Sequence, residues 1–348
     1  MSSRVPKNLL VIVLVVITAW LVYASGIFNP ISKPPSKKPK TIGVIYQRQQ
    51  QLAYDGLKAT MNKLGYTDKD IKYDEVLVTQ GTTYYQDIEN GAKKLIADKV
   101  DVFFVTNEQI AKTVLEQTKG TNFPIVFMTR FHDPLAYGLI DSYKSSGNNS
   151  TGVATNLAET VQKNLFFFKE INPKIKKIGV FGEGFQIPNF SDAVFAEAKK
   201  QAPKLGLTIV EYTTKNPPDA TSKNWYEVAN KIKPGDIDGI LHLPGHYYDK
   251  QEVDETTFLA NRLHLPHSVP APDMPTGGSF SFSTDFTAAA GQAAVMVDKI
   301  FKGAKPADIP IEFGSKSTLM LNLKRASDAG FKFPNSMLSI AEVKIDGK

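Results

Sequence analysis

The chain has no cysteine among its 348 residues, so disulfide bonds are excluded as a source of stability. The absence of cysteine also excludes attachment of a lipid to an N-terminal cysteine. The fold must therefore be stabilised by burial of apolar side chains. Residues 41–348 are numerous enough for this, and their length predicts two lobes rather than a single core.

Acidic residues are absent from positions 1–40, which carry six basic residues: Arg4, Lys7, Lys33, Lys37, Lys38 and Lys40. The whole chain has 41 basic and 35 acidic side chains, a net charge of +6. The excess therefore lies in this segment, and residues 41–348 have no net charge. This distribution favours attraction of the segment to anionic lipid headgroups. It argues against nucleic acid as a partner of the body.

Within this segment, residues 9–28 form an almost unbroken apolar run without a polar stripe. As a helix, such a run is about 30 Å long and matches the apolar core of a bilayer. We therefore expect residues 1–28 to anchor an exported chain in the membrane, followed by a Pro/Lys-rich tether over residues 29–40. The alternative is a signal segment that is cleaved after Ala24, which would release the protein in secreted form.

From position 41 onward, short apolar runs alternate with segments of helical periodicity. The second half of the body repeats this alternation. No hairpin signal interrupts it, so each half predicts a parallel sheet covered by helices on both faces. The predicted strands are residues 41–46, 73–78, 100–105, 124–128, 177–181, 207–210, 237–242 and 267–269. The predicted helices are residues 54–64, 85–98, 107–118, 191–201, 225–231, 256–263 and 286–301.

Two such lobes place a ligand in a cleft, because open parallel sheets bind ligands outside the carboxyl ends of their strands. We expect the lobes to close around the ligand by bending at three crossover segments. The predicted crossovers are residues 153–156, 280–285 and 311–314.

Several motifs, in order and spacing, carry a family resemblance over residues 41 to about 343. They are FPIVFMTRFHDP at 123–134, Gly138-Leu139, NSTGV at 149–153, GQAA at 291–294, IFKG at 300–303, PADIP at 306–310, and NLKRA at 322–326 with Gly330 and Pro334. This series resembles ABC transporter substrate-binding proteins, in the group with tryptophan- and tyrosine-type binders.

The resemblance implies a type I periplasmic-binding-protein fold. Its first lobe would hold residues 41–154 and 285–310, and its second lobe residues 155–284 and 311–348. It also implies an extracytoplasmic protein that captures a small organic ligand, such as an aromatic amino acid, for an ABC permease and ATPase. The alternative is a membrane-tethered sensor of the same fold that signals to a membrane partner.

Candidate ligand-binding residues of the first lobe follow its predicted strands. Thr106 and Asn107 follow the third strand, where free backbone N–H groups of the next helix would help to hold an anion. The alternative role for either residue is to cap that helix. Tyr46 ends the first strand and is also expected to fill core. Gln47 follows that strand, and the alternative for it is a solvated loop. Asp133 either contacts ligand or shapes a turn with Pro134.

In the second lobe, Phe185, Asn189 and Ser191 are the candidates after the strand at 177–181, and Asn189 with Ser191 match a ligand-contacting Asn-Ser pair of the family. The candidates His246 and Tyr247 follow the strand at 237–242, where Gly245 and His246 stand in place of an acidic pair that is common in the family. The missing acid argues against a plain amino-acid ligand. Asp285 is the acid best placed to replace it, and its alternative role is to cap the helix at 286–301. Aromatic residues near strand ends predict a ligand with a flat apolar part, held by stacking.

Catalysis and metal binding are not indicated. His242 and His246 are four residues apart but straddle a strand end and a Pro-Gly turn, so helical metal-binding geometry cannot form there. No nucleophile elbow of the G-x-S-x-G kind occurs in the sequence. The sequence therefore predicts a binding protein without enzymatic activity, cofactor or metal.

Overall fold

A computed structural model describes residues 38–79, 82–130, 132–183, 190–214, 222–242, 250–270, 274 and 277–346 of the chain. Within these ranges, no helix is both long enough and apolar enough to cross a membrane. The predicted anchor at residues 1–28 lies outside the described residues, as does the tether as far as residue 37.

The first sheet has six strands in the order β11-β5-β4-β3-β1-β2, and every neighbouring pair is parallel. Its strands consist largely of β-branched and aromatic residues, which suit a sheet that is buried on both faces. Their bounds are β1 (Lys40–Gln47), β2 (Ile71–Val78), β3 (Val102–Val105), β4 (Ile125–Met128), β5 (Ser150–Ala154) and β11 (Glu312–Phe313).

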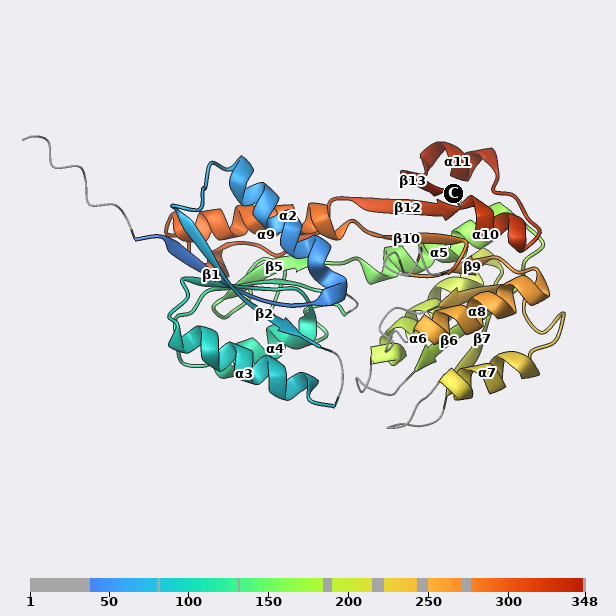
Figure 1. Ribbon diagram of the computed structural model, residues 1–348, viewed down its shortest axis with the longest axis horizontal. Coiled ribbons are helices and arrows are strands. Elements are labelled where there is room, and N and C mark those ends of the chain that lie inside the picture. Colours follow the sequence, from blue (N-terminus) through green and yellow to red (C-terminus); the bar gives the residue numbers. More distant parts are fainter. Residues whose placement is uncertain are drawn as a thin grey trace, which may run out of the picture. The chain divides into compact units, whose positions relative to one another are not determined.

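Helices of the described part of the chain cover both faces of this sheet (Figure 1). On one face, α2 (Gln51–Lys63) and α9 (Phe286–Phe301) bury one core cluster against β1, β3 and β4. On the other face, α3 (Tyr84–Ala97) and α4 (Glu108–Gln117) bury a second cluster. The helices α2 and α9 pack very closely at Gly56, where a Cβ atom would lie 2.6 Å from the carbonyl oxygen of Thr287. Only glycine allows this approach.

The second sheet has seven strands in the order β13-β12-β10-β9-β8-β6-β7. All its pairs are parallel except β10 with β12, which is antiparallel. The strands are β6 (Lys177–Glu183), β7 (Thr208–Thr214), β8 (Gly239–His242), β9 (His267–Ser268), β10 (Phe280–Thr284), β12 (Ser317–Asn322) and β13 (Val343–Ile345).

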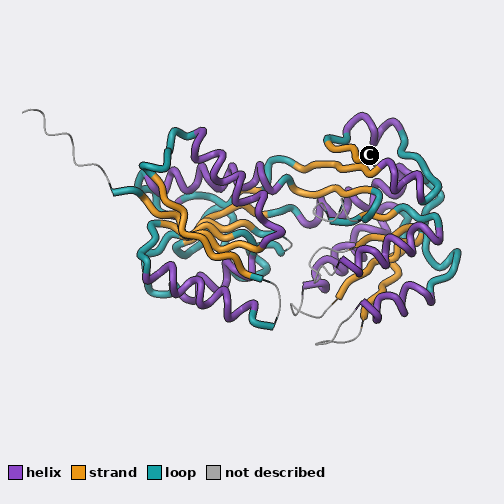
Figure 2. Tube along the Cα trace, in the orientation of Figure 1, coloured by secondary structure: helices purple, strands orange, loops and turns teal. Residues whose placement is uncertain are grey.

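Helices cover both faces of the second sheet as well, and Figure 2 shows its strands lying among them. One core cluster joins the sheet to α5 (Leu157–Ile171), α6 (Phe190–Gln201), α10 (Leu323–Asp328) and α11 (Asn335–Ile340). The opposite cluster involves α7 (Ser222–Lys231) and α8 (Lys250–Leu263). The described residues also include short 3₁₀ helices: η1 (Arg48–Gln50), η2 (Ala202–Leu205) and η4 (Pro306–Asp308).

The prediction of two α/β lobes with parallel sheets is confirmed, apart from the antiparallel pair β10–β12. The strand β11 pairs with β5 of the first sheet, through Glu312 opposite Val153 and Phe313 opposite Ala154. These two residues therefore belong with the first sheet, although the predicted boundary assigned residues from 311 onward to the second lobe.

The chain passes between the two sheets three times: from β5 to α5, from β10 to α9, and from β11 to β12. These passages meet at Gly314, whose backbone N–H donates to the carbonyl of Ala154 at 2.9 Å. A Cβ atom at Gly314 would lie 2.7 Å from the Thr284 methyl group. Segments from three parts of the sequence are thus in contact at the predicted crossovers.

Candidate functional site

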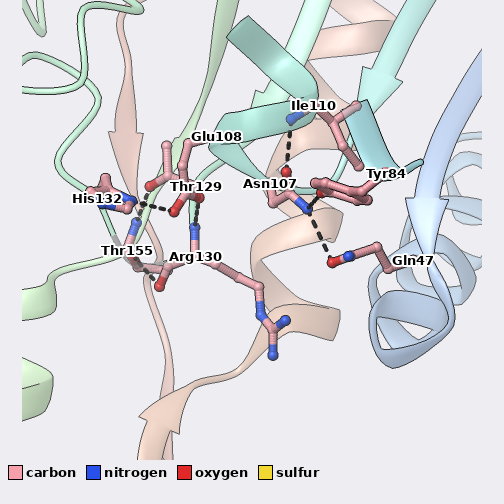
Figure 3. Close-up of polar contacts among 9 residues, drawn as sticks. All are labelled: Gln47, Tyr84, Asn107, Glu108, Ile110, Thr129, Arg130, His132 and Thr155. Carbon is pink, nitrogen blue, oxygen red and sulfur yellow. Dashed lines mark hydrogen bonds and ion pairs between the residues drawn. The ribbon is translucent and has the colours of Figure 1, made fainter. Parts of the chain in front are cut away.

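Polar side chains gather at the carboxyl edge of the first sheet, after the adjacent strands β4, β3 and β1 (Figure 3). Gln47 is the last residue of β1, and Gln50 is the last residue of η1, which follows it. Thr106 and Asn107 follow β3, and Glu108 begins α4. The loop after β4 carries Arg130 and His132. All seven residues are buried, with exposed fractions of 9% or less. Such burial of polar groups costs free energy unless they are hydrogen-bonded.

Two glutamines form the first part of this polar group. The amide nitrogen of Gln50 donates to Oε1 of Gln47 at 3.2 Å, and the backbone N–H of Gln47 donates to Oε1 of Gln50 at 3.2 Å. The hydroxyl of Thr106 also donates to Oε1 of Gln50. A hydroxyl has only one hydrogen to donate. Thr106, predicted to hold a ligand anion, therefore holds Gln50 in this structure.

Asn107 connects the glutamines to the helices behind them. Its Oδ1 atom accepts from the backbone N–H of Ile110 at 2.8 Å, so it is the N-cap of α4, the alternative role that the sequence left open. Its amide nitrogen donates to Oε1 of Gln47 at 3.3 Å and to the Tyr84 hydroxyl at 3.1 Å. One side chain thereby fixes a helix start, a loop and a tyrosine.

Glu108, Arg130 and His132 form the second part of the polar group. Glu108 is completely buried, and its two carboxylate oxygens accept from two different groups. Oε2 accepts from the backbone N–H of Arg130 at 2.8 Å, and Oε1 lies 2.7 Å from Nδ1 of His132. A carboxylate only accepts, so Nδ1 of His132 carries the hydrogen of this bond.

Aromatic rings surround the polar groups. The ring centroids of Tyr84 and Tyr85 are 5.3 Å apart, and those of His132 and Tyr137 are 4.7 Å apart. Burial raises the pKa of Tyr84, and the negative charge of Glu108 adds to this, while the bond from Asn107 and the charge of Arg130 oppose it. The Tyr84 phenol is therefore neutral at physiological pH, and its oxygen accepts a hydrogen bond from the amide of Asn107.

Over residues 42–345 the sequence matches the family of ABC transporter substrate binding proteins. The chain belongs to this family. No curated protein sequence matches the chain significantly.

Three solved structures show the same fold, and each is covered completely by 88% of this substrate-binding protein. One is an ABC domain in complex with L-Trp from Streptococcus pneumonia, with a TM-score of 0.73 and 22% identity. Another is a conserved domain protein from Vibrio cholerae, with a TM-score of 0.72 and 22% identity. The third is a ligand-free, open substrate-binding protein with adhesive properties from Clostridium difficile, with a TM-score of 0.69 and 21% identity.

Three predicted ligand residues of the substrate-binding protein occupy structural positions. Tyr46 lies in the core, with its ring centroid 5.0 Å from that of Tyr54 and its hydroxyl 3.0 Å from Glu75. Asp133 accepts from the backbone N–H groups of Leu135 and Ala136 and bonds the Tyr143 hydroxyl, which is the predicted turn.

Asp285 caps α9 by accepting from the backbone N–H of Ala288 at 3.0 Å, and it pairs with Lys316 at 3.2 Å. Asp285 therefore caps α9, which is the alternative role that the sequence left open for it.

The structure does not describe the side chains of the candidate ligand-binding residues in the second lobe. Phe185, Asn189, His246 and Tyr247 lie outside the described residues, and Ser191 lies in α6 with its side chain not described. Among the described residues, no group of three His, Asp or Glu side chains is arranged to hold a metal ion.

The first-lobe site also contains side chains outside the list of predicted ligand-binding residues: Tyr84, Glu108, Arg130, His132, and Gln50 from the polar run that follows the first strand. A basic residue and a histidine directly after a buried strand, as at 130 and 132, are the sequence signal for part of this set.

Proposed function

We propose that this chain is the extracytoplasmic substrate-binding protein of an ABC importer, and that it captures a small organic ligand without catalysis. Family membership over residues 42–345 supports this proposal. The buried, hydrogen-bonded polar side chains at the carboxyl edge of the first sheet support the proposed location of the ligand-binding site. Fixed donors and acceptors at this edge reduce the conformational cost of binding a ligand.

We further propose that the ligand has a flat apolar part. Tyr84, Tyr85, His132 and Tyr137 place aromatic rings beside the polar groups. A stacked ring contributes about 1 kcal/mol beyond the burial of its area. The structurally similar domain from Streptococcus pneumonia has L-Trp bound, which agrees with a ligand of this kind. The second-lobe candidates Phe185, Asn189, Ser191, His246 and Tyr247 would complete the site after closure at the three crossovers.

In this proposal, residues 1–28 hold the protein at the outer face of the cytoplasmic membrane, and the closed form delivers its ligand to a permease and its ATPase. Residues 9–28 would cross the membrane. The positive tether would lie near anionic headgroups, consistent with the segregation of charge in the sequence.

Ligand binding is tested with the full chain purified in mild detergent. Native mass spectrometry would identify co-purified small molecules, and calorimetry would measure binding of aromatic and aliphatic amino acids, sugars and nucleosides. We expect one co-purified or added organic molecule to bind with a defined stoichiometry. The absence of any bound molecule across both measurements would contradict the proposed function.

The location of the site is tested with Asn107→Asp. This variant keeps the oxygen that caps α4 but loses the amide donors to Gln47 and Tyr84. We expect affinity to fall about tenfold or more, since a lost buried hydrogen bond costs about 1–3 kcal/mol. The matched control is Asn322→Asp, because Asn322 is also a buried N-cap, bonded to the backbone N–H of Arg325 at 3.0 Å. Equal loss of affinity in both variants would place the site elsewhere.

A further inference from the structure

A small polar cavity lies inside the second lobe, where α8 and α10 pack near the central strand β9. Its volume is about 10 Å³, which is enough for one water molecule. The polar residues that line it are Thr257, Asn261, His267, Ser279 and Arg325. A cavity of this size with polar walls holds water, whereas a purely apolar cavity stays dry. The candidate ligand-binding site in the first lobe shares none of these residues.

The imidazole ring of His267 is buried at this cavity without a hydrogen-bond partner among the described residues. The residue is 1% exposed, and neither Nδ1 nor Nε2 bonds a protein group. Burial, together with the positive charge of Arg325, lowers the pKa of His267 to about 3 and keeps the ring neutral. A neutral imidazole has one donor and one acceptor nitrogen. Because buried polar atoms without a partner cost free energy, we expect a molecule from solvent to bond the ring.

The hydroxyl of Thr257, on α8, is a second group of this kind at the same cavity. Thr257 is 6% exposed, and its Oγ1 atom bonds no protein group among the described residues. A threonine in a helix commonly donates to a carbonyl one turn earlier, as Thr118 does to Val114 at 2.8 Å. Thr257 makes no such bond. Two side chains from different elements therefore bring unused hydrogen-bonding groups to one small space.

The backbone and the ring of His267 are both held in place. The hydroxyl of Ser279 accepts from the backbone N–H of His267 at 2.8 Å and donates to its carbonyl oxygen at 2.9 Å. The backbone N–H of Ser279 donates to the same carbonyl at 2.7 Å. The ring stacks on that of His242, with centroids 6.2 Å apart and an angle of 24° between the planes. These contacts fix the ring against the cavity.

We propose that the cavity binds one structural water molecule, which bridges the ring of His267 on β9 and the hydroxyl of Thr257 on α8. Water both donates and accepts, so it matches a neutral imidazole in either tautomer and a hydroxyl. A metal cation is disfavoured, because Arg325 brings a positive charge and no acidic residue is among the described residues that line the cavity. The water stabilises the second lobe whether or not a ligand is bound, independently of the proposed function.

The direction of the stability change in Thr257→Val tests this bridge, because valine keeps the shape of threonine without its hydroxyl. If the hydroxyl bonds a water, its loss should raise the unfolding equilibrium constant about fivefold, the usual effect of losing a buried hydrogen bond. If the hydroxyl has no partner, its removal should leave the constant unchanged or lower it. Urea denaturation of the full chain in mild detergent measures the constant. An unchanged or lowered constant would overturn the proposal.

Two further variants show whether the effect belongs to this cavity. Ser150→Ala is the matched control, because the Ser150 hydroxyl is also buried without a protein partner but does not line the cavity. It should not raise the unfolding equilibrium constant. In a His267→Leu background, Thr257→Val should have a smaller effect than in the wild type, since the water has already lost one of its two partners. Equal effects in both backgrounds would mean that His267 and Thr257 share no water.

A crystal structure of the full chain would locate the bound molecule directly. We expect an electron-density peak within about 3.2 Å of both a ring nitrogen of His267 and the Oγ1 atom of Thr257. Crystals soaked in bromide distinguish water from a halide ion, which is the competing occupant because Arg325 is positively charged. An anomalous bromide peak at this position would identify a halide site and overturn the proposal. A cavity without any density peak would overturn it as well.

Discussion

At the scale of single residues, His267 links the stability of the second lobe to pH. Burial, together with the positive charge of Arg325, lowers the pKa of His267 to about 3. In the unfolded chain its pKa is about 6.5. Between these values the unfolded state binds more protons than the folded state, so the free energy of unfolding rises with pH. This stability is present above the unfolded pKa and is lost as the pH falls toward 3.

We expect His267 alone to make the free energy of unfolding about 2 kcal/mol lower at pH 5 than at pH 7.5. Urea denaturation at the two pH values measures this difference, and His267→Leu should reduce it by that amount. His264→Asn is the matched control, because His264 is exposed and has a φ of 54°, which asparagine also adopts. If His267→Leu and His264→Asn show the same pH dependence, His267 is not the titrating group.

At the scale of elements, variants of Asp285 at the start of α9 distinguish a structural role of this residue from a ligand-binding role. The carboxylate of Asp285 accepts from the backbone N–H of Ala288 and forms an ion pair with Lys316. This ion pair is half-exposed and contributes little to stability. Asp285→Ala should lower the free energy of unfolding by about 1 kcal/mol, whereas Asp285→Asn keeps a capping oxygen and should lower it less. We expect ligand affinity in Asp285→Asn to change less than about threefold. An affinity loss of about 30-fold with unchanged melting temperature would instead assign Asp285 to the ligand.

Periodicity predicted most elements of the fold to within a few residues. The strands β1 to β4 and the helices α2, α3 and α4 follow local apolar patterns, which the sequence displays directly. The helix α5 was not predicted, because its LFFF run obscures the helical period. The antiparallel pairing of β10 with β12 was also missed. It joins segments whose proximity depends on the whole second lobe, and no local pattern indicates it.

The candidate site was predicted only in part, for a related reason. Asn107 and Gln47 stand at strand ends and were predicted from that position alone, and the structure places both in the buried polar group. Glu108, in contrast, has the sequence pattern of a solvated charge in the first turn of a helix. Its burial depends on Arg130 and His132, which lie 22 and 24 residues further along the chain. The burial of such a residue depends on partners that the strand order of the sheet brings close to it, and its neighbours in the sequence do not indicate it.

At the scale of the whole molecule, the contact among the three crossovers bears on the proposed closure. Hinges are a few positions whose backbone dihedral angles absorb a domain motion. Gly314 is a candidate because it touches both other crossovers, through Ala154 and Thr284. Replacement by alanine has two separable effects. It restricts backbone rotation, and it places a methyl group 2.7 Å from the methyl group of Thr284.

We expect Gly314→Ala to lower the free energy of unfolding by about 1–3 kcal/mol, the usual cost of overpacking. The double variant Gly314→Ala with Thr284→Ser removes the overlapping methyl group and should recover most of that stability. Small-angle scattering should show a decrease in the radius of gyration when the wild-type protein binds its ligand, and a smaller decrease in both variants. If the double variant compacts as much as the wild type, rotation at residue 314 is not used in closure. The contact at Gly314 would then serve packing alone, and the hinge would lie in the β5–α5 and β10–α9 passages.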